Sequence, residues 1–434
     1  MSYRGCWQFL YLEKRQIENN KPLQDYTILN IQHQLGDVTA QTEALIALGA
    51  LPSNRYFLPP PYTHHREFEL FVFKYYGISK ENFFQSSSYR LRYNYDKCRL
   101  LQVIFEFHQM IKIELSKKRQ KHNNLLVLDD GGYFSEALTT LLDIHNEISI
   151  ETRLIEQTSH GMFKYVDQQD ISKTLNKFGI SIIDVASSES KKRLEPTIIA
   201  EACLNMLSYL FYDALNHLRV PKPLKSQNCL LLGYGQTVGY ALTDYGDLEL
   251  FSKYSVKVWD RDVMRHKIAE NNGFEIFNQW NNKEEFDYII GCTGRCSLPL
   301  SSLSLLRNNC YLISVSSAAI EFPFNDMIEH SLLNGNKNLM KISLSDIQLN
   351  ELNNENIHRN ITFQIKNQRN ITIVNGGMPI TFLGILNPVI PEKFDLTVSC
   401  MIAVSIQAVS TEQQINDKQQ IIPLDSKYSK FICN

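Results

Sequence analysis

The sequence has no long apolar run and no concentration of charge of one sign. No stretch of about 20 consecutive apolar residues occurs in the 434-residue chain, so a membrane-spanning helix is not expected. The formal net charge is -2, and the clustered positive charge that nucleic-acid phosphates require is missing. These absences argue against a membrane protein and against a nucleic-acid-binding protein.

The cysteines show no disulfide or metal-binding framework. Nine are scattered along the chain, an odd count, and no two are spaced as CxxC. Cys292 and Cys296 lack partners at ligand spacing, so no metal site is expected. The apolar stretch near the N-terminus is too short for a secretory signal and charges follow it at once. We therefore expect a reduced, cytoplasmic protein.

Short apolar runs alternate with longer amphipathic stretches along most of the chain. Residues 124–130 and 229–233 are typical strand candidates, and residues 99–118 and 199–218 are typical helix candidates. Such alternation predicts an α/β fold, with parallel sheets flanked by helices. The chain is also too long for one compact core, so at least two domains are expected.

A polar segment with two prolines, RVPKPLKSQN at 219–228, is the predicted linker between the domains. The first domain is then expected to span residues 1–220, completed by about 386–410. The second spans 221–385 and has the pattern of a nucleotide-binding unit. Residues 411–434 are polar and are predicted to form a C-terminal arm.

A glycine-rich turn, CLLLGYGQTVGYAL at 229–242, opens the predicted second domain. Gly233, Gly235 and Gly239 follow an apolar run, as in a Rossmann dinucleotide-binding turn, but three residues instead of two separate the last two glycines. Asp260 ends the next apolar run, where a carboxylate would bind the ribose hydroxyls of NAD. Thr293 lies at a later strand end, beside which a nicotinamide ribose could lie. The alternative is an α/β domain whose glycines only turn the chain.

Three further motifs carry a resemblance to a known family. They are KPLQDYTILNIQHQLGDVTAQTEALIALGA at 21–50, LLVLDDGGYF at 125–134 and ETRLIEQTSHG at 151–161. Together with the glycine turn, they resemble the S-adenosylhomocysteine hydrolases over nearly the whole chain. The resemblance implies a substrate domain, a tightly held NAD, a nucleoside substrate and a homo-oligomer, either tetramer or dimer.

The resemblance also implies a reaction and the residues that perform it. In that family NAD transiently oxidises the ribose 3′-hydroxyl, which acidifies the 4′ proton and allows the 5′ thiol to leave. His33 and Asp130 match catalytic positions on the 5′ side, and Lys191 with Glu195 matches the lysine and carboxylate on the 3′ side. The alternatives are polar residues at strand ends and, for Lys191 and Glu195, a charged helix start.

The remaining matches define the predicted pocket. The substrate-binding positions are Asp37, Glu156, Gln157 and Asn387, and the further cofactor-binding positions are Thr158, Ser159, Ser317 and Thr381. Several depart from the family pattern: Gln157 replaces a ribose-binding Glu, Ser317 replaces a His, and Asp37 is one methylene shorter than the family's Glu. The motifs of the family are thus kept, whereas several residues predicted to contact the substrate or the cofactor differ.

The leading hypothesis is NAD-assisted cleavage of the thioether of S-adenosylhomocysteine or a related 5′-substituted nucleoside. Gln157 and Ser317 favour an alternative, a non-catalytic NAD- or nucleoside-binding paralogue that regulates the hydrolase. A third hypothesis is an ordinary dehydrogenase that uses free NAD and accumulates NADH.

Overall fold

The chain folds into two compact units. The computed structural model describes residues 20–84, 95–116, 124–144, 151–213, 218–224, 228–235, 239, 255–278, 286–316, 319–332, 342–343, 357–365, 369–410 and 421–426. The first unit comprises residues 1–87, 97–195 and 390–434, and the second comprises 88–96 and 196–389.

A six-stranded sheet forms the centre of the first unit, in the order β14-β5-β4-β3-β1-β2 with every pair parallel. Its strands are β1 (Tyr26–Ile31), β2 (Arg55–Phe57), β3 (Asn124–Asp129), β4 (Glu151–Glu156), β5 (Ile182–Asp184) and β14 (Ile421–Pro423). The buried parts of β3, β4 and β5 are mainly apolar, as in parallel strands covered on both faces, and a buried carboxyl residue ends each of them: Asp129, Glu156 and Asp184.

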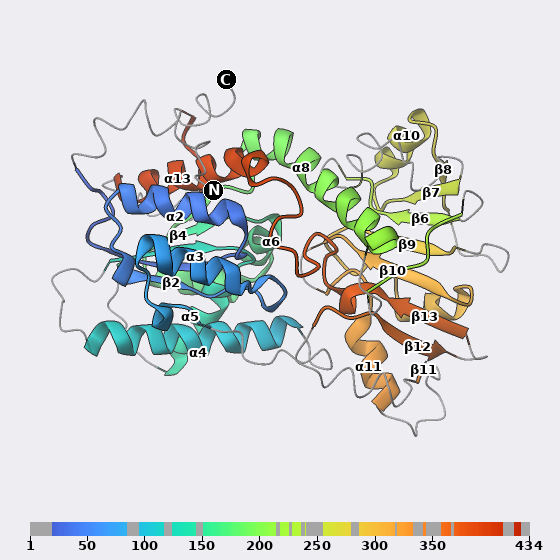
Figure 1. Ribbon diagram of the computed structural model, residues 1–434, viewed down its shortest axis with the longest axis horizontal. Coiled ribbons are helices and arrows are strands. Elements are labelled where there is room, and N and C mark those ends of the chain that lie inside the picture. The colour runs from blue at the N-terminus through green and yellow to red at the C-terminus, as the bar shows by residue number, and fades with distance from the viewer. Residues whose placement is uncertain are drawn as a thin grey trace. The chain divides into compact units, whose positions relative to one another are not determined.

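Helices cover this sheet (Figure 1). They are α2 (Gly36–Ala47), α3 (Arg66–Tyr76), α4 (Tyr95–Ser116), α5 (Tyr133–Ile144), α6 (Ser159–Asp167), α7 (Gln169–Lys177) and α13 (Asp395–Ser410), with short 3₁₀ turns at Pro52–Asn54, Pro61–Thr63, Lys80–Asn82 and Pro391–Phe394. The helices α2 and α13 pack together against apolar side chains of β3, β4 and β5 in one buried cluster.

The helix α13 is buried along nearly its whole length. In the described part of the chain, the stretch Pro391–Ser410 alone has the length and composition of a membrane span, and 61% of its apolar window is buried inside the protein. It packs against α2 and β4, as a helix that is apolar on all sides does in the core of a protein.

An eight-stranded sheet forms the centre of the second unit, in the order β11-β12-β13-β10-β9-β6-β7-β8. Its strands are β6 (Cys229–Leu232), β7 (Val256–Trp259), β8 (Glu275–Ile276), β9 (Tyr288–Gly291), β10 (Cys310–Ser314), β11 (Ile342–Ser343), β12 (Ile361–Ile365) and β13 (Arg369–Ile373). The described helices are α8 (Glu189–Ser208), α10 (Val263–Asn271) and α11 (Phe324–Leu332), with 3₁₀ turns at Leu300–Leu305 and Val374–Gly377. The helix α8 continues as a short π-helix at Tyr209–Asp213.

The six parallel strands of this sheet follow the doubly wound order of a Rossmann fold. Counted along the chain from β6, they lie in the order 3-2-1-4-5-6, and β12 and β11 extend the sheet antiparallel. The strand β6 lies where the winding reverses, which is the place where such folds bind their ligands. The predicted α/β class with a Rossmann-type second domain is therefore confirmed.

The boundaries between the units differ from the predicted ones. The first lies between Glu195 and Pro196, inside α8, and not at the proline-containing segment 219–228. That segment belongs to the second unit because Val220 is fully buried in its core and Tyr288 donates a hydrogen bond to the carbonyl of Pro221 (2.8 Å). The prolines lead the chain into β6 without separating two domains.

The predicted C-terminal arm is also partly corrected. Residues Ile421–Pro423 form β14, which pairs in parallel with β5 and closes one edge of the first sheet. The side chain of Gln407 in α13 fixes this segment by donating to the carbonyl of Pro423 (3.1 Å) and accepting from the N–H of Asp425 (2.9 Å). The described part of the segment is therefore integral to the first unit.

Candidate active site

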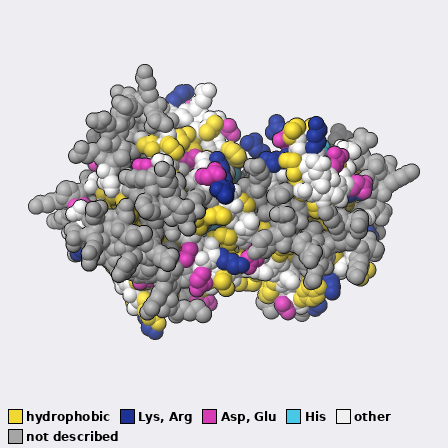
Figure 2. Space-filling model, turned by 90° about the horizontal axis from the view of Figure 1, so that it is seen from above, with side chains coloured by type: hydrophobic (Ala, Val, Ile, Leu, Met, Phe, Trp, Pro, Cys, Tyr) yellow, Lys and Arg dark blue, Asp and Glu magenta, His cyan; other side chains and the backbone are white. Residues whose placement is uncertain are grey.

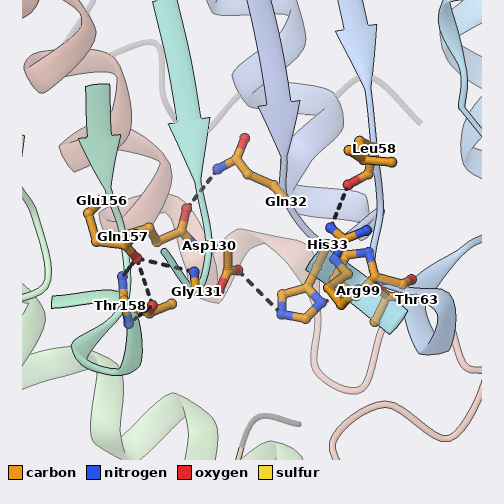
Figure 3. Close-up of polar contacts among 12 residues, drawn as sticks. Gln32, His33, Leu58, Thr63, Arg99, Asp130, Gly131, Glu156, Gln157 and Thr158 are labelled. Carbon is orange, nitrogen blue, oxygen red and sulfur yellow. Dashed lines mark hydrogen bonds and ion pairs between the residues drawn. The ribbon is translucent and has the colours of Figure 1, made fainter. Parts of the chain in front are cut away.

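The carboxyl ends of β1, β3 and β4 bring the main candidate residues of the first unit together. Ile31 is in register with Asp129, and Asp129 with Glu156, so the three strands end at the same level. The side chains that follow, among them His33, Asp130 and Gln157, consequently gather at one edge of the sheet (Figure 3). This edge is the usual location of a binding site in a parallel α/β unit.

His33 and Asp130 form a pair at this edge. The Nε2 atom of His33 lies 3.3 Å from Oδ2 of Asp130, and its Nδ1 atom lies 3.0 Å from the hydroxyl of Thr63. Burial lowers the pKa of the imidazole, the Asp130 carboxylate opposes this effect, and the Arg99 guanidinium adds to it. A largely buried imidazole held on both sides is suited to exchange a proton with a bound molecule. Their catalytic role stays a prediction.

Lys191 and Glu195 form a second pair, one helical turn apart at the start of α8. The Nζ atom of Lys191 lies 3.4 Å from Oε2 of Glu195 and donates a hydrogen bond to the backbone carbonyl of Gln157. The other carboxylate oxygen of Glu195 accepts from the hydroxyl of Thr397 in α13 (3.0 Å). Gln157 in turn donates its N–H to the carbonyl of Asp129 (3.0 Å). These hydrogen bonds link the Lys191–Glu195 pair to the same sheet edge as the His33–Asp130 pair.

Glu156, a predicted substrate-binding residue, binds groups of its own unit. Its side chain is fully buried and its oxygens accept from the N–H groups of Gly131 (3.2 Å), Gly132 (3.0 Å) and Thr158 (2.8 Å), as well as from the Thr158 hydroxyl (2.7 Å). Both oxygens of this carboxylate are therefore engaged inside the first unit, and its contact with a substrate stays a prediction. Glu156 instead holds the turn that carries Asp130.

Thr158 and Ser159, predicted to bind the cofactor, begin α6. The Thr158 hydroxyl donates to Glu156 and accepts from the N–H of Gly161 (3.0 Å), which makes it the N-cap of the helix. Its hydroxyl proton is therefore used inside the first unit. Ser159 is exposed in the first turn of α6. Their predicted contact with a cofactor stays a prediction.

A chain of three glutamine amides, which the sequence reasoning missed, fixes Gln157. The buried Gln41 donates from Nε2 to Oε1 of the buried Gln32 (3.0 Å), and Gln32 donates from Nε2 to Oε1 of Gln157 (2.7 Å). The amide nitrogen of Gln157 is then the group left to face a ligand. The sequence offers no signal for this arrangement except that Gln32 directly precedes His33.

Asp37 lies in the first turn of α2, four residues after His33. Burial raises the pKa of its carboxyl to about 7, two backbone N–H groups oppose this, and the nearby charges of Glu195 and Asp130 raise it further. Its predicted contact with a substrate stays a prediction. Asn387, the other predicted substrate contact, belongs to the second unit, where it is exposed.

The glycine turn after β6 is built for close approach of backbone to a ligand. Gly233 adopts a φ of +100°, and a Cβ atom there would lie 2.9 Å from the carbonyl oxygen of Cys292. A Cβ atom on Gly239 would overlap the carbonyl of Gly233 itself. Gly235, half-buried, lies between them. Positions that exclude any side chain are what a dinucleotide turn needs.

Asp260 lies beside this turn at the end of β7. Its carboxylate accepts from the N–H of Tyr234 (2.5 Å) and from the N–H of Asp262 (2.8 Å). One bond to each oxygen leaves lone pairs for two further donors, such as the hydroxyls of a ribose. The residues present therefore fit NAD.

Two other predicted cofactor positions lie at strand ends of the same sheet. The hydroxyl of Thr293, after β9, is 2.9 Å from Oε2 of Glu321. The fully buried Glu321 also accepts from the N–H of Gly294 (2.6 Å) and from the Ser316 hydroxyl. The sequence reasoning missed Glu321, which holds the loops after β9 and β10. Thr381 is buried, and the predicted position Ser317 lies outside the described residues.

No group of three or more His, Cys, Asp and Glu side chains among the described residues could hold a metal ion.

No protein-family model and no curated protein matches the chain. Similar solved structures include the A chain of dipicolinate synthase from Bacillus subtilis (11% identity, 89% of this chain and 97% of that chain, TM-score 0.40) and D-lactate dehydrogenase from Escherichia coli (11%, 89% and 98%, TM-score 0.42). A third is an NAD-complexed D-isomer specific 2-hydroxyacid dehydrogenase from Lactobacillus delbrueckii ssp. bulgaricus (10%, 89% and 99%, TM-score 0.36). Likeness at this level carries no argument about ligand or activity.

Proposed function

We propose that this protein is an enzyme that cleaves and re-forms the thioether of S-adenosylhomocysteine, or of a related 5′-substituted nucleoside, with NAD as a resident cofactor. The observation that carries the proposal is the meeting of two proton-exchanging pairs, His33–Asp130 and Lys191–Glu195, at one edge of one sheet. Both pairs lie in sequence motifs that resemble those of the S-adenosylhomocysteine hydrolases.

The His33–Asp130 pair is proposed to act at the 5′ position of the nucleoside. Because burial lowers its pKa, His33 is neutral at physiological pH and can accept the proton of an attacking water or thiol. Asp130, 3.3 Å from the ring, stabilises the imidazolium that forms and aids return of the proton to the leaving sulfur.

The Lys191–Glu195 pair is proposed to act at the 3′-hydroxyl. Lys191 is held by the carbonyl of Gln157, so its Nζ atom faces the same sheet edge as His33. Glu195, fixed by Thr397, can exchange a proton with the lysine as the hydroxyl loses its own.

NAD would be held by the turn at Gly233, Gly235 and Gly239 and by Asp260, and when bound it supplies reversible removal of hydride from the ribose. The backbone of the turn and the Asp260 carboxylate would orient the dinucleotide. We further propose that the protein is a cytoplasmic homo-oligomer, and sedimentation of the purified chain tests the assembly.

The second candidate is a non-catalytic NAD- or nucleoside-binding protein. The amide of Gln157 favours it, because the group that remains after Gln32 has bound its oxygen is a neutral N–H donor. A ribose whose hydroxyls must be held and then deprotonated is better served by a carboxylate.

The test is the absorbance of enzyme-bound NADH when adenosine is added to protein loaded with NAD. Bound NADH with net cleavage of S-adenosylhomocysteine, both abolished by Lys191→Ala, is the expected result. Adenosine and NAD that bind without any NADH signal would establish the binding protein instead. Free NADH that accumulates with turnover would indicate an ordinary dehydrogenase, since the proposed cycle returns the cofactor unchanged.

A further inference from the structure

Two carboxyl groups lie side by side beneath the turn that carries Asp130, without a cation bound to either. Asp129 and Glu156 are register partners in the parallel strands β3 and β4, so their side chains project from the same face of the sheet. Both residues are 0% exposed. Neither has a role in the proposed chemistry.

Lys164 and Arg99, the cations whose charges act on Asp129, form their bonds elsewhere. Lys164 in α6 forms its ion pair with Glu136 of α5 (3.0 Å). The guanidinium of Arg99 in α4 donates to the backbone carbonyls of Leu58 (2.8 Å) and Pro59 (2.9 Å), as Figure 3 shows in part. Within the described residues, no lysine, arginine or histidine therefore forms a hydrogen bond or ion pair with Asp129 or Glu156.

Hydrogen-bond donors are distributed unequally between the two carboxyl groups. Glu156 accepts from Gly131, Gly132 and Thr158 as described above, and the hydroxyl of Tyr165 lies 3.4 Å from its Oε2. Asp129 accepts through Oδ2 from the N–H of Phe134 (2.9 Å). Its Oδ1 atom is buried and has no donor among the described residues.

Two adjacent buried carboxylates cannot both be ionised when no cation compensates them. Since donors surround both oxygens of Glu156, that group is the carboxylate. We propose that Asp129 carries the proton on Oδ1, which leaves Glu156 as the one charged member of the pair, and that Asp129 so acts as a positioning residue for Asp130. The neutralised pair allows Glu156 to hold Gly131 and Gly132, the two residues that follow Asp130.

The groups that face the pair favour one proton within it. Burial is the main cause that raises the pKa of both carboxyls, that of Asp129 to about 7. Lys164 and Arg99 lower the pKa of Asp129 from a distance, while the charge of Asp130 raises it. Tyr165 stays a neutral donor because burial and the two carboxyls raise its pKa as well.

A proton held by the folded state alone makes stability depend on pH with a definite sign. Between the ordinary pKa of an aspartic acid and the raised one, the folded state binds one more proton than the unfolded state. The contribution of Asp129 to stability is therefore fully present at low pH and is lost as pH rises toward and through about 7.

The direct test is infrared spectroscopy of the full-length protein at pH 6, recorded for wild type and for Asp129→Asn. We expect a protonated-carboxyl C=O band that shifts on ¹³C-labelling of aspartate, is unmoved by labelling of glutamate, and disappears in Asp129→Asn. Asp37→Asn serves as the matched control, because Asp37 is the other aspartate whose pKa is raised to about 7. The proposal is overturned if the difference spectrum, wild type minus Asp129→Asn, lacks this band or contains a band that moves with labelled glutamate.

Unfolding by urea over pH 4 to 8 gives the second measurement. Asn at position 129 keeps an N–H donor where the proton was and does not titrate, so Asp129→Asn should match wild type near pH 4 and should unfold at higher urea than wild type as the pH rises toward 8. Gln at position 156 places its amide NH2 against the N–H of either Gly131 or Gly132, so Glu156→Gln should unfold at markedly lower urea. The reverse order, or an Asp129→Asn protein that does not fold, would contradict the assignment. Neither measurement depends on the proposed function.

Discussion

The ammonium group of Lys191 donates its hydrogen bond to the backbone carbonyl of Gln157, 34 residues earlier in the chain. Because the acceptor is main chain, the position of Lys191 does not depend on which side chain stands at 157. A substitution at that position can therefore change how the site holds a nucleoside without moving the lysine.

Replacing Gln157 by Glu tests this separation. The carboxylate keeps an acceptor for Gln32 and offers its second oxygen to a ribose hydroxyl. A charge-assisted hydrogen bond is worth about 1 kcal/mol more than a neutral one, so adenosine should bind roughly fivefold more tightly by calorimetry. Gln157→Leu, which removes both amide atoms, is the matched comparison and should bind more weakly. Equal affinities for all three proteins would place the ribose elsewhere.

Asp130→Asn tests the histidine pair. The Asp130 charge raises the pKa of His33 against the effect of burial, so its removal should move that pKa further down. We expect turnover to fall by about 10²-fold or more. We also expect the midpoint of the His33 titration, followed by the NMR shifts of its ring protons, to move to lower pH. His64→Asn controls for a histidine outside the pair, since His64 is bound to Glu69 (2.7 Å). An unchanged His33 titration in Asp130→Asn would show that the two groups do not interact.

Asp260→Ala tests the proposed cofactor site in the second unit. Loss of this carboxylate removes the ribose acceptor and leaves the N–H of Tyr234 without its partner. NAD affinity, measured by fluorescence, should fall about tenfold, which corresponds to about 1.4 kcal/mol. Asp262→Ala is the control, because that carboxylate is exposed and caps α10 through the N–H of Met264 (2.9 Å). If both variants lose NAD affinity equally, the effect belongs to the loop and not to Asp260.

Gly161→Ala tests the packing of α6 against the buried carboxylate of Glu156. A Cβ atom at this position would overlap the carboxyl group of Glu156, which is buried and bound on all sides. Overpacking of this kind costs about 1–3 kcal/mol, so the urea midpoint should fall accordingly. Ser159→Ala, two residues earlier and exposed, should leave the midpoint almost unchanged. Stability equal to wild type in Gly161→Ala would mean that α6 can move away from Glu156.

Much of the fold could be predicted because buried parallel strands appear in the sequence as apolar runs. The prediction of a strand at 124–130 matches β3, Asn124–Asp129, and the run at 229–233 matches β6, Cys229–Leu232. The linker was misplaced because prolines mark a turn whether or not the turn separates two domains. The antiparallel β12 was missed although ITFQI alternates apolar and polar residues, the pattern of a half-buried strand that its burial follows.

The candidate site was predictable only where it lies at strand ends. His33 and Asp130 directly follow apolar runs, so their meeting at one sheet edge follows from parallel pairing. The role of Glu156 was not predictable, because it depends on α6 approaching closely at Gly161 and on the backbone of Gly131 and Gly132. The hydrogen bonds that connect Gln41, Gln32 and Gln157 join residues more than a hundred positions apart, and no local sequence pattern predicts them.

The strand β14 has a consequence for how the protein is made. Residues 421–423 complete the first sheet, yet they follow the whole second unit, 196–389, in the chain. During synthesis the second unit therefore has all of its residues before the first one does. Until residues 421–423 are available, β5 is an unpaired edge strand of the first sheet. During that interval we expect β5 to be open to binding by a chaperone or to pairing with a strand of another nascent chain.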